Sequence, residues 1–413
     1  MTRVASSFED KDPFDLFIDV GFERVQTRML ISRERHTGTE VALLPELRYT
    51  GVDTRLNLDL HIGLWHDVEF TFGLPIDFAD NETWAFASGR NVTNSTVTNE
   101  CLQANGQLLD PNCGTTGVGA TSLFPISQTT PAQTFRGGIG NLRFGLSYAP
   151  FNQNNDDTKP MWVVGLNYEA PTATKLDPYL LTTADTRGSI GDRHHKYTFF
   201  TAFSRKMGIA DPYFRAYYTL PYKGPQWYSN CDHRDPTVLS YPQNCSTDAG
   251  AQWTRAETGL QLPHKVGMVF GSEFLVYDMP EKTQRIALDV RGVTDYVGKG
   301  RYYNELSGVL RKMLYTGDYL KFGGQLAINA LASDYVSVKA SATLLYHTDH
   351  YLTDEARGVD LNDDQVVDII PDGSGNAPEV NPNFDFRFDE TSRRFRASQI
   401  NEFKIDITAT FAF

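Results

Sequence analysis

The hydrophobic residues of this chain alternate with polar residues over many short stretches, and the clearest stretch is the C-terminus. Six apolar side chains share one face of a strand there: Phe403, Ile405, Ile407, Ala409, Phe411 and Phe413. The opposite face carries Glu402, Lys404, Asp406, Thr408, Thr410 and Ala412. A period of two residues predicts a β-strand with one apolar and one polar face. Taken alone, this stretch fits a soluble edge strand as well as a strand that faces lipid.

The same alternation predicts a long hairpin over residues 55–78. Its first strand alternates Leu56, Leu58, Leu60, Ile62 and Leu64 with Asn57, Asp59, His61 and Gly63. Its second strand alternates Val68, Phe70, Phe72, Leu74 and Ile76 with Glu69, Thr71, Gly73 and Asp77. The turn falls at residues 65–67. The pattern recurs at residues 16–23, 142–148, 162–169, 214–220, 266–276, 286–290, 320–330 and 336–346.

The connections between these strands alternate in length. Short turns are expected at residues 65–67, 151–159, 207–210, 279–283 and 332–334. Long polar loops are expected near residues 79–137, 171–195, 221–263, 298–317 and 352–395. A set of short turns on one side and long loops on the other is typical of transmembrane barrels.

These features predict an all-β fold, namely a transmembrane antiparallel up-and-down β-barrel of about twelve strands. Fourteen strands is the alternative, because no extra strand is assigned to residues 40–54, 253–265 or 298–317. Residues 1–14 then form a segment before the first strand, and residues 15–413 form one barrel. A soluble β-sandwich competes with this prediction, but it would bury its apolar faces and would not sort its loops by side.

Composition narrows the choice of partner and membrane class. The net charge of -13 disfavours nucleic acid as a partner, because binding phosphates needs basic patches. Hydrophobic residues make up 40% of the chain, and no run approaches the roughly 18 apolar residues that a transmembrane helix needs. A helical membrane protein is thereby excluded, whereas a barrel hides its apolar residues in alternation.

The four cysteines form two pairs that are close in sequence. Cys101 and Cys113 lie in one predicted loop, and Cys231 and Cys245 lie in another. An even number, short spacing and polar surroundings favour two disulfides that close loops in an oxidising compartment. Zinc is the alternative, but neither pair has Cys-x-x-Cys spacing.

The alternating C-terminal strand with its terminal phenylalanine resembles the assembly signal of Gram-negative outer-membrane β-barrels, and the barrel pattern resembles porin-like members over nearly the whole chain. The resemblance implies an outer-membrane location, short periplasmic turns and extracellular long loops. It also implies contact with lipid and lipopolysaccharide, and recognition by the barrel-assembly machinery. The start of the chain lacks the apolar core of a signal peptide, so this interpretation assumes that the signal was removed.

The polar faces of the predicted strands would point into the barrel. The expected pore-lining residues are Asp59, His61, Glu69, Arg143, Glu169, Arg215, Glu273, Asp289, Arg291, Lys321, Lys339, Lys404 and Asp406. Such side chains either line a pore and set its selectivity, or pair with one another and fill a narrow barrel. Barrels of about eight strands are packed, and those of about sixteen hold open channels, so twelve strands leave both outcomes open.

One acidic loop resembles the calcium loops of dockerins and EF-hands. Its candidate ligands are Asp360, Asn362, Asp364, the carbonyl of Val366, and Asp368. Two departures weaken the match, because Gln365 replaces the expected glycine and Pro371 stands at the twelfth position. A calcium-binding loop and an ordinary solvated acidic loop therefore remain alternatives.

Enzymatic and metal-dependent activities receive little support. No Gly-x-Ser-x-Gly or similar nucleophile motif is present, so the chain is not expected to be an enzyme. His347 and His350 would converge on a metal only if the chain turned between them. Two functions are therefore expected: a porin-like channel for passive diffusion of small solutes, or a plugged barrel. The plugged barrel would anchor an envelope-spanning machine, for motility, adhesion or secretion, through its loops.

Overall fold

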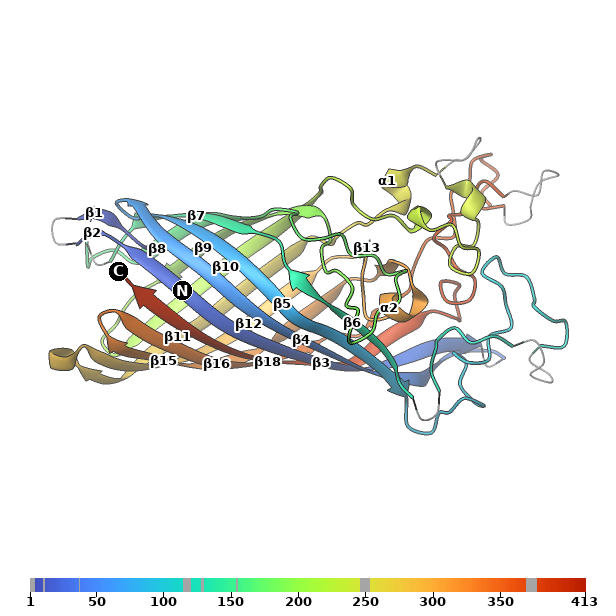
Figure 1. Ribbon diagram of the computed structural model, residues 1–413, viewed down its shortest axis with the longest axis horizontal. Helices are drawn as coiled ribbons and strands as arrows, with labels where there is room; N and C mark the ends of the chain where they lie inside the picture. Colours follow the sequence, from blue (N-terminus) through green and yellow to red (C-terminus); the bar gives the residue numbers. More distant parts are fainter. Residues whose placement is uncertain are drawn as a thin grey trace.

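Twelve antiparallel strands close into a barrel in the computed structural model of this chain, among the residues that it describes. Those residues are 4–9, 12–36, 38–113, 120–127, 130–153, 155–245, 253–368 and 377–413. The barrel axis lies horizontally in Figure 1, with the short turns at one end and the long loops at the other. The C-terminus lies at the short-turn end. No helix among the described residues is long and apolar enough to cross a membrane.

The barrel strands are β3 (Leu16–His36), β4 (Val41–Trp65), β5 (Val68–Phe86), β7 (Arg143–Phe151), β8 (Met161–Glu169), β9 (His194–Ser204), β10 (Ala210–Lys223), β11 (Lys265–Met279), β12 (Gln284–Val297), β15 (Tyr319–Ser333), β16 (Val336–His347) and β18 (Phe395–Ala412). Two short strands extend the wall, where β6 (Ala132–Ile139) pairs with β5 and β17 (His350–Tyr351) pairs with β18. Two separate ribbons are β1 (Ser7–Glu9) with β2 (Asp12–Phe14), and β13 (Gly300–Tyr302) with β14 (Leu314–Thr316).

The helical elements are single turns in the connections. They are α1 (Arg255–Thr258), α2 (Ser307–Leu310) and the 3-10 turns η1 (Asn230–Asp232), η2 (Pro242–Asn244) and η3 (Pro280–Lys282).

The C-terminal strand closes the barrel. β18 pairs with β16 on one side and with β3 on the other, so the last strand of the chain joins the first barrel strand. Ile407, for example, lies opposite both Ala340 and Phe22. Because this pairing leaves no free edge in the ring, every strand has two hydrogen-bonded neighbours, as a membrane-spanning sheet requires.

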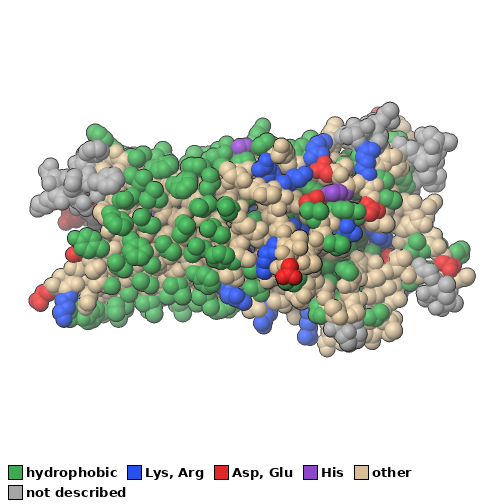
Figure 2. Space-filling view, in the orientation of Figure 1, with side chains coloured by type: hydrophobic (Ala, Val, Ile, Leu, Met, Phe, Trp, Pro, Cys, Tyr) green, Lys and Arg blue, Asp and Glu red, His purple; other side chains and the backbone are tan. Residues whose placement is uncertain are grey.

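The outer face of the barrel carries a belt of exposed apolar side chains. Phe270, Leu326, Ile328, Leu344 and Ile407 are between 48% and 59% exposed on neighbouring strands. Figure 2 shows hydrophobic side chains, in green, covering the half of the barrel near the short turns, with most of the Lys, Arg, Asp and Glu side chains of this face beyond it. Large exposed apolar surfaces are unfavourable in water but match the hydrocarbon core of a bilayer. The predicted transmembrane barrel is confirmed, and its strand count is twelve.

Four strands rise well beyond this belt. β3, β4, β5 and β18 contain 21, 25, 19 and 18 residues, whereas a tilted strand needs only about 9–11 to cross a bilayer. Residues 40–54 add no extra strand, as predicted, because residues 41–54 form the upper part of β4, which extends further than the alternation indicated. The strand count is unaffected, since this segment continues a strand that was already predicted.

The predicted loops occur at the expected end of the barrel, but several of their bounds are corrected. Residues 194–195 of one predicted loop belong to β9, and residues 221–223 of another belong to β10. The loop expected at residues 79–137 begins only after Phe86, and residues 132–137 belong to β6. The loop expected at residues 298–317 contains α2 and the ribbon of β13 and β14, none of which enters the barrel wall. A further short connection, predicted by no pattern, joins β3 to β4 at the long-loop end.

Both predicted disulfides are present in the long loops. Cys101 is bonded to Cys113, and Cys231 is bonded to Cys245. None of the described cysteines is free. The zinc alternative is therefore wrong, because a sulfur in a disulfide is not available as a thiolate ligand.

We expect Leu326→Arg to lower the free energy of unfolding by about 2–4 kcal/mol, because it places a charge on the lipid-facing side of β15. Leu326 is 58% exposed and lies between Val290 of β12 and Ala342 of β16. The measurement is denaturant unfolding of the protein folded into lipid vesicles. Leu361→Arg is the matched control, because Leu361 is 49% exposed in a loop, and it should change stability by no more than about 0.5 kcal/mol. Equal losses in the two variants would contradict the lipid-facing belt.

Candidate functional site

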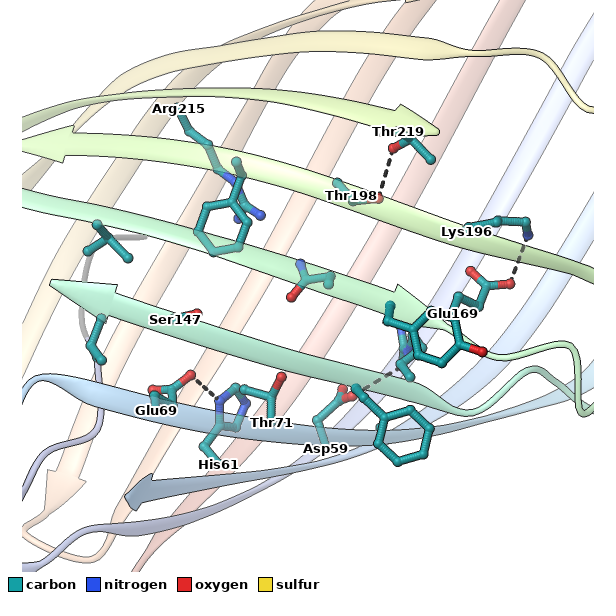
Figure 3. Close-up of a pocket in the computed structure, with 18 of the residues that line it drawn as sticks. Asp59, His61, Glu69, Thr71, Ser147, Glu169, Lys196, Thr198, Arg215 and Thr219 are labelled. Carbon is teal, nitrogen blue, oxygen red and sulfur yellow. Dashed lines mark hydrogen bonds and ion pairs between the residues drawn. The ribbon is translucent and has the colours of Figure 1, made fainter. Parts of the chain in front are cut away.

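A polar cavity occupies the middle of the barrel. Its volume is about 540 Å³, and six of the thirteen predicted pore-lining residues line it: Asp59, His61, Glu69, Arg143, Glu169 and Arg215. Several inward side chains around it are small, including Thr71, Ser147, Thr198 and Thr219. Figure 3 shows how these side chains project from neighbouring strands into one space. The volume exists because the inward positions of β5, β7, β9 and β10 carry small residues instead of a packed core.

The other seven predicted residues do not line this cavity. They are Glu273, Asp289, Arg291, Lys321, Lys339, Lys404 and Asp406. Several of them pair with neighbours inside the barrel: Lys321 lies 3.0 Å from Glu402, Arg291 pairs with Asp289, and Lys404 pairs with Glu23. These pairs lie on β12, β15, β18 and β3. The sequence identified inward-facing residues without separating cavity walls from packed ion pairs.

Ion pairs also organise the walls of the cavity itself. Arg143 Nη2 lies 3.2 Å from Asp59 Oδ1, and Lys196 Nζ lies 2.8 Å from Glu169 Oε1. His61 connects two carboxylates, with Nδ1 3.0 Å from Glu69 Oε1 and Nε2 3.6 Å from an oxygen of Asp19. Dashed lines mark the pairs of Lys196 and His61 in Figure 3. These contacts fix the orientation of charged side chains around a space that remains polar.

A second cavity of about 220 Å³ adjoins the first toward the long-loop end. It shares Arg143, Glu169 and Lys196 with the central cavity. Its remaining charged walls are Asp53, Arg55, Asp77, Asp80 and Asp192. The two cavities together extend a polar interior along the barrel axis.

The segment before the first strand reaches into the barrel at the short-turn end. The amide of Ala5 donates a 2.7 Å hydrogen bond to Glu69 Oε2, and the hydroxyl of Ser7 donates to the carbonyl of Gly63 at 2.6 Å. Val4 packs against a buried apolar cluster from β7, β8 and β9, the strands that follow β5 in the barrel wall. The described part of this segment therefore lies at the mouth of the barrel, beside the neighbouring strands from β4 to β9.

The long loops close the other end with an apolar core. We call the described parts of residues 87–131, 170–193, 224–264, 298–318 and 348–394 the loop cap. Phe124, Leu306, Leu310 and Phe388 of the loop cap pack against inward residues of the tall strands, such as Trp84. This cluster is dry and resembles the core of a globular domain, in contrast to the polar cavity below it.

One short segment of the loop cap enters the barrel. The Trp84 indole donates a 2.7 Å hydrogen bond to the carbonyl of Glu305, and the Tyr303 hydroxyl donates to Glu82 Oε2 at 2.5 Å. The guanidinium of Arg136 lies 4.6 Å from the centre of the Tyr303 ring. Figure 1 shows α2 and β13 at the long-loop end of the barrel. We call residues 303–310 the inserted segment.

Buried charges hold the loops of the cap to one another. Arg301 and Glu355 form a two-bonded ion pair, with Nε 2.7 Å from one carboxylate oxygen and Nη2 2.5 Å from the other. Arg301 also donates to the carbonyls of Glu257 and Gly259, so one guanidinium joins three loops. This arrangement satisfies a charge that would otherwise be costly to bury.

A buried lysine and aspartate lie deeper in the loop cap. Lys312 donates to the carbonyl of Asn383 at 2.7 Å, and burial lowers the pKa of its ammonium group. Burial raises the pKa of the Asp389 carboxyl well above its usual range. Both directions have the same cause, because a low-dielectric surrounding disfavours the charged form of either group.

Sequence reasoning missed several residues that line the central cavity. They are Val4, Thr71, Gly73, Phe144, Ser147, Val163, Asn167, Tyr168, Lys196, Thr198, Phe200, Thr219 and Lys265. Lys265 is the first residue of β11 and lies one position before the predicted strand. Lys196 lies in β9, whose sequence His194–Ser204 has no strict alternation. Extending each predicted strand by one or two residues would have placed Lys265 inside the barrel.

The candidate calcium loop remains a prediction. Its residues 369–376, with Pro371, lie outside the described residues. In the described part, Asn362 donates to Asp364 and Asp368 at 3.2 and 3.4 Å, and the amide of Gln365 donates to Asp360. Among the described residues, no group of three or more His, Cys, Asp or Glu side chains is placed to hold a metal ion.

His347 and His350 lie where the chain turns between β16 and β17, which is the condition under which their side chains could approach each other. The ring of Tyr319 lies 5.7 Å from the ring of His347 and 4.1 Å from that of His350, measured between centroids. His347 Nε2 also lies 3.1 Å from Glu402 Oε2. These contacts give both histidines a structural role at the boundary of barrel and loop cap.

Comparisons with known proteins give no family assignment. No protein-family model matches the chain, and no curated protein matches it. Among solved structures, an outer membrane channel from Pseudomonas putida F1 is similar at 9% identity and a TM-score of 0.43, covering 96% of this chain and 95% of that chain. A Pseudomonas aeruginosa FadL homologue is similar at 10% identity and a TM-score of 0.37, covering 96% and 90%. The outer membrane protease OmpT from Escherichia coli is similar at 8% identity and a TM-score of 0.30, covering 98% and 99%. Similarity at this level says nothing about what this chain transports, binds or cleaves.

We expect Glu355→Ala to destabilise the loop cap by about 3–5 kcal/mol, because it leaves the Arg301 guanidinium buried without its partner. Both side chains of this pair are only 6% exposed. The measurement is the free energy of local opening of residues 300–316, obtained by hydrogen exchange.

The matched control for this prediction is Glu390→Ala. Glu390 pairs with Arg357, but the two side chains are 29% and 40% exposed, so the loss should be below about 1 kcal/mol. If both variants opened the loop cap to the same extent, burial would not be what makes the Arg301 pair strong.

Proposed function

We propose that this protein is a channel of the bacterial outer membrane that conducts small polar solutes. The observation that carries the proposal is the polar cavity of about 540 Å³ in the middle of a closed barrel with an apolar outer belt. Cavities of about 300–1,000 Å³ suit small molecules. A barrel that served only as an anchor would need no such space at the level of the membrane.

The charges around the cavity support solutes that are polar or charged. Asp59, Glu69 and Glu169 alternate with Arg143 and Lys196 around its wall. An apolar solute would leave these groups poorly hydrated, whereas a polar solute can replace the water that they bind. We therefore infer passage of small hydrophilic molecules, in which the lining charges of both signs set the selectivity.

The two ends of the barrel support regulated rather than free passage. The inserted segment and the apolar core of the loop cap lie across the long-loop end, and the segment of Val4–Ser7 lies at the short-turn end beside β4 and β5. Passage of a solute requires that the inserted segment move. This segment is held by its hydrogen bonds to Trp84 and Glu82 and by the packing of Leu306 and Leu310, and its displacement is the conformational step that we propose for opening.

A plugged anchor is the second candidate function, and the loop cap favours it. Five long connections converge on one structure that is stabilised by a buried apolar cluster, two disulfides and buried ion pairs. Such a rigid external structure suits the binding of protein partners of the cell envelope. The channel and the anchor differ in whether the central cavity ever connects both sides of the membrane.

The proposed location fixes the orientation of the barrel. In a Gram-negative outer membrane the short turns face the periplasm and the long loops face the exterior. The apolar belt would contact lipid and lipopolysaccharide, and the C-terminal strand would be recognised by the barrel-assembly machinery. The loop disulfides agree with an oxidising compartment. That the chain has no enzymatic activity, and that calcium orders the loop at residues 360–368, stay predictions.

We expect the purified protein to give discrete current steps in a planar lipid bilayer, and Trp84→Ala to raise the fraction of time spent open at least about tenfold. Trp84 is completely buried and holds the inserted segment, so its removal should weaken the closed arrangement by about 3–5 kcal/mol. The measurement is single-channel recording of protein whose folding has been checked by circular dichroism.

Trp227→Ala is the control for this experiment. Trp227 packs on Lys223 and Arg255 in the loop cap, away from the inserted segment, so its removal should leave the open fraction unchanged. Silence of the folded wild type and of both variants would contradict the channel and would favour the anchor.

A further inference from the structure

Two cations on one wall of the central cavity have no carboxylate partner. Arg215 of β10 and Lys265 of β11 both line the cavity, and neither forms an ion pair within the part of the chain that the structure describes. The other two Lys and Arg residues of the lining are paired, Arg143 with Asp59 and Lys196 with Glu169. Arg215 and Lys265 are therefore two positive groups of the lining that have no ion-pair partner among the described residues.

Arg215 forms no ion pair with any carboxylate among the described residues, and its contacts are aromatic. Its guanidinium lies 4.3 Å from the centre of the Phe200 ring, and its Nε is buried without a hydrogen-bond partner. Figure 3 shows the Arg215 side chain directed into the cavity and joined to no other residue by a dashed line. An aromatic face holds a guanidinium in place while leaving its N–H groups free to bind a ligand.

Lys265 lies on the same wall, four strand positions nearer the loop cap than Arg215, because Arg215 pairs with Val269 whereas Lys265 pairs with Thr219. The barrel register aligns Asn167, Thr198, Thr219 and Lys265 across β8, β9, β10 and β11. Thr198 and Thr219 share a hydrogen bond of 2.9 Å between their hydroxyls, and all four residues line the cavity. The carboxylates of Glu169 and Asp192 are each paired with Lys196, at 2.8 and 2.6 Å. Asp295 of β12, opposite Gly267, accepts a hydrogen bond from the Tyr217 hydroxyl.

We propose that Arg215 and Lys265 form a binding subsite for small oxyanions, carboxylates or phosphates, in the central cavity, with Thr198, Thr219 and Asn167 as neutral hydrogen-bonding groups. The proposal rests on the proposed channel function, since it names the chemical class of the solute. An unpaired cation inside a barrel is unfavourable unless water or an anion solvates it. The two backbone positions are about 13 Å apart along the strands, so the long Arg215 and Lys265 side chains would approach an anion held between them from opposite ends and give it charge-assisted hydrogen bonds. The cavity would then select for anions at one wall, although the chain as a whole carries a net charge of -13.

Isothermal titration of the detergent-folded, full-length protein with citrate and with inorganic phosphate, at low ionic strength, tests this subsite without requiring any current. We expect at least one of the two probes to bind. Arg215→Gln and Lys265→Gln should each weaken binding about tenfold, because each removes a charge-assisted hydrogen bond. Binding should also weaken as salt is added. Circular dichroism confirms that each variant folds.

Lys206→Gln is the matched control. Lys206 lies in the short turn between β9 and β10, so this variant removes one positive charge from the same hairpin outside the cavity. Its affinity for the probe should equal that of the wild type. Binding of citrate alone identifies a carboxylate site, and binding of phosphate alone identifies a phosphate site. Absence of binding by both probes, or binding that Arg215→Gln and Lys265→Gln leave unchanged, would overturn the subsite. Binding in a protein that shows no current would retain the subsite and reject the channel.

Discussion

The pairing of β18 with β16 and β3 is the constraint on which the rest of the structure depends. A sheet inside a bilayer has no water to satisfy its backbone, so its two edge strands must meet. Once the ring closes, the register of the last strand decides that Ile407 faces outward and Asp406 faces inward. A shift by one residue would exchange these faces for the whole strand. The cavity and its charges therefore follow from how the ring is joined.

The closed ring gives the molecule two interiors with opposite chemistry. At the level of the belt, apolar side chains face outward, so the inside is built from ion pairs, hydroxyl groups and the space between them. Above the belt, the loop cap packs an ordinary apolar core against the inner faces of the tall strands. The inserted segment marks the border between these two regions. We therefore place the control of passage at this border, where the apolar core of the loop cap meets the polar cavity.

Sequence alone predicted much of the fold, because lipid on one side and polar groups on the other impose a two-residue period on every strand. The same logic did not show that β4 continues through residues 41–54, where the strand lies beyond the belt and its outer face no longer has to be apolar. The disulfides followed from local spacing. The contact between Trp84 and Glu305 joins residues 221 positions apart and has no periodic signal, so neither the inserted segment nor the loop cap was predictable. Inward faces were predictable, but the division between packed pairs and cavity walls depends on side-chain sizes on several strands at once.

The outer face of β3 changes character within a single strand. Phe22 is exposed and apolar, and Arg24 and Arg28, which follow on the same face, are exposed and charged. The hydrocarbon boundary must lie near this change, since a charge on the lipid face is costly at the bilayer midplane and cheap near the interface. This change from apolar to charged residues on β3 therefore sets the depth at which the molecule sits in the bilayer. The central cavity, fixed to the same strands by hydrogen bonds, is held at a constant height relative to the lipid.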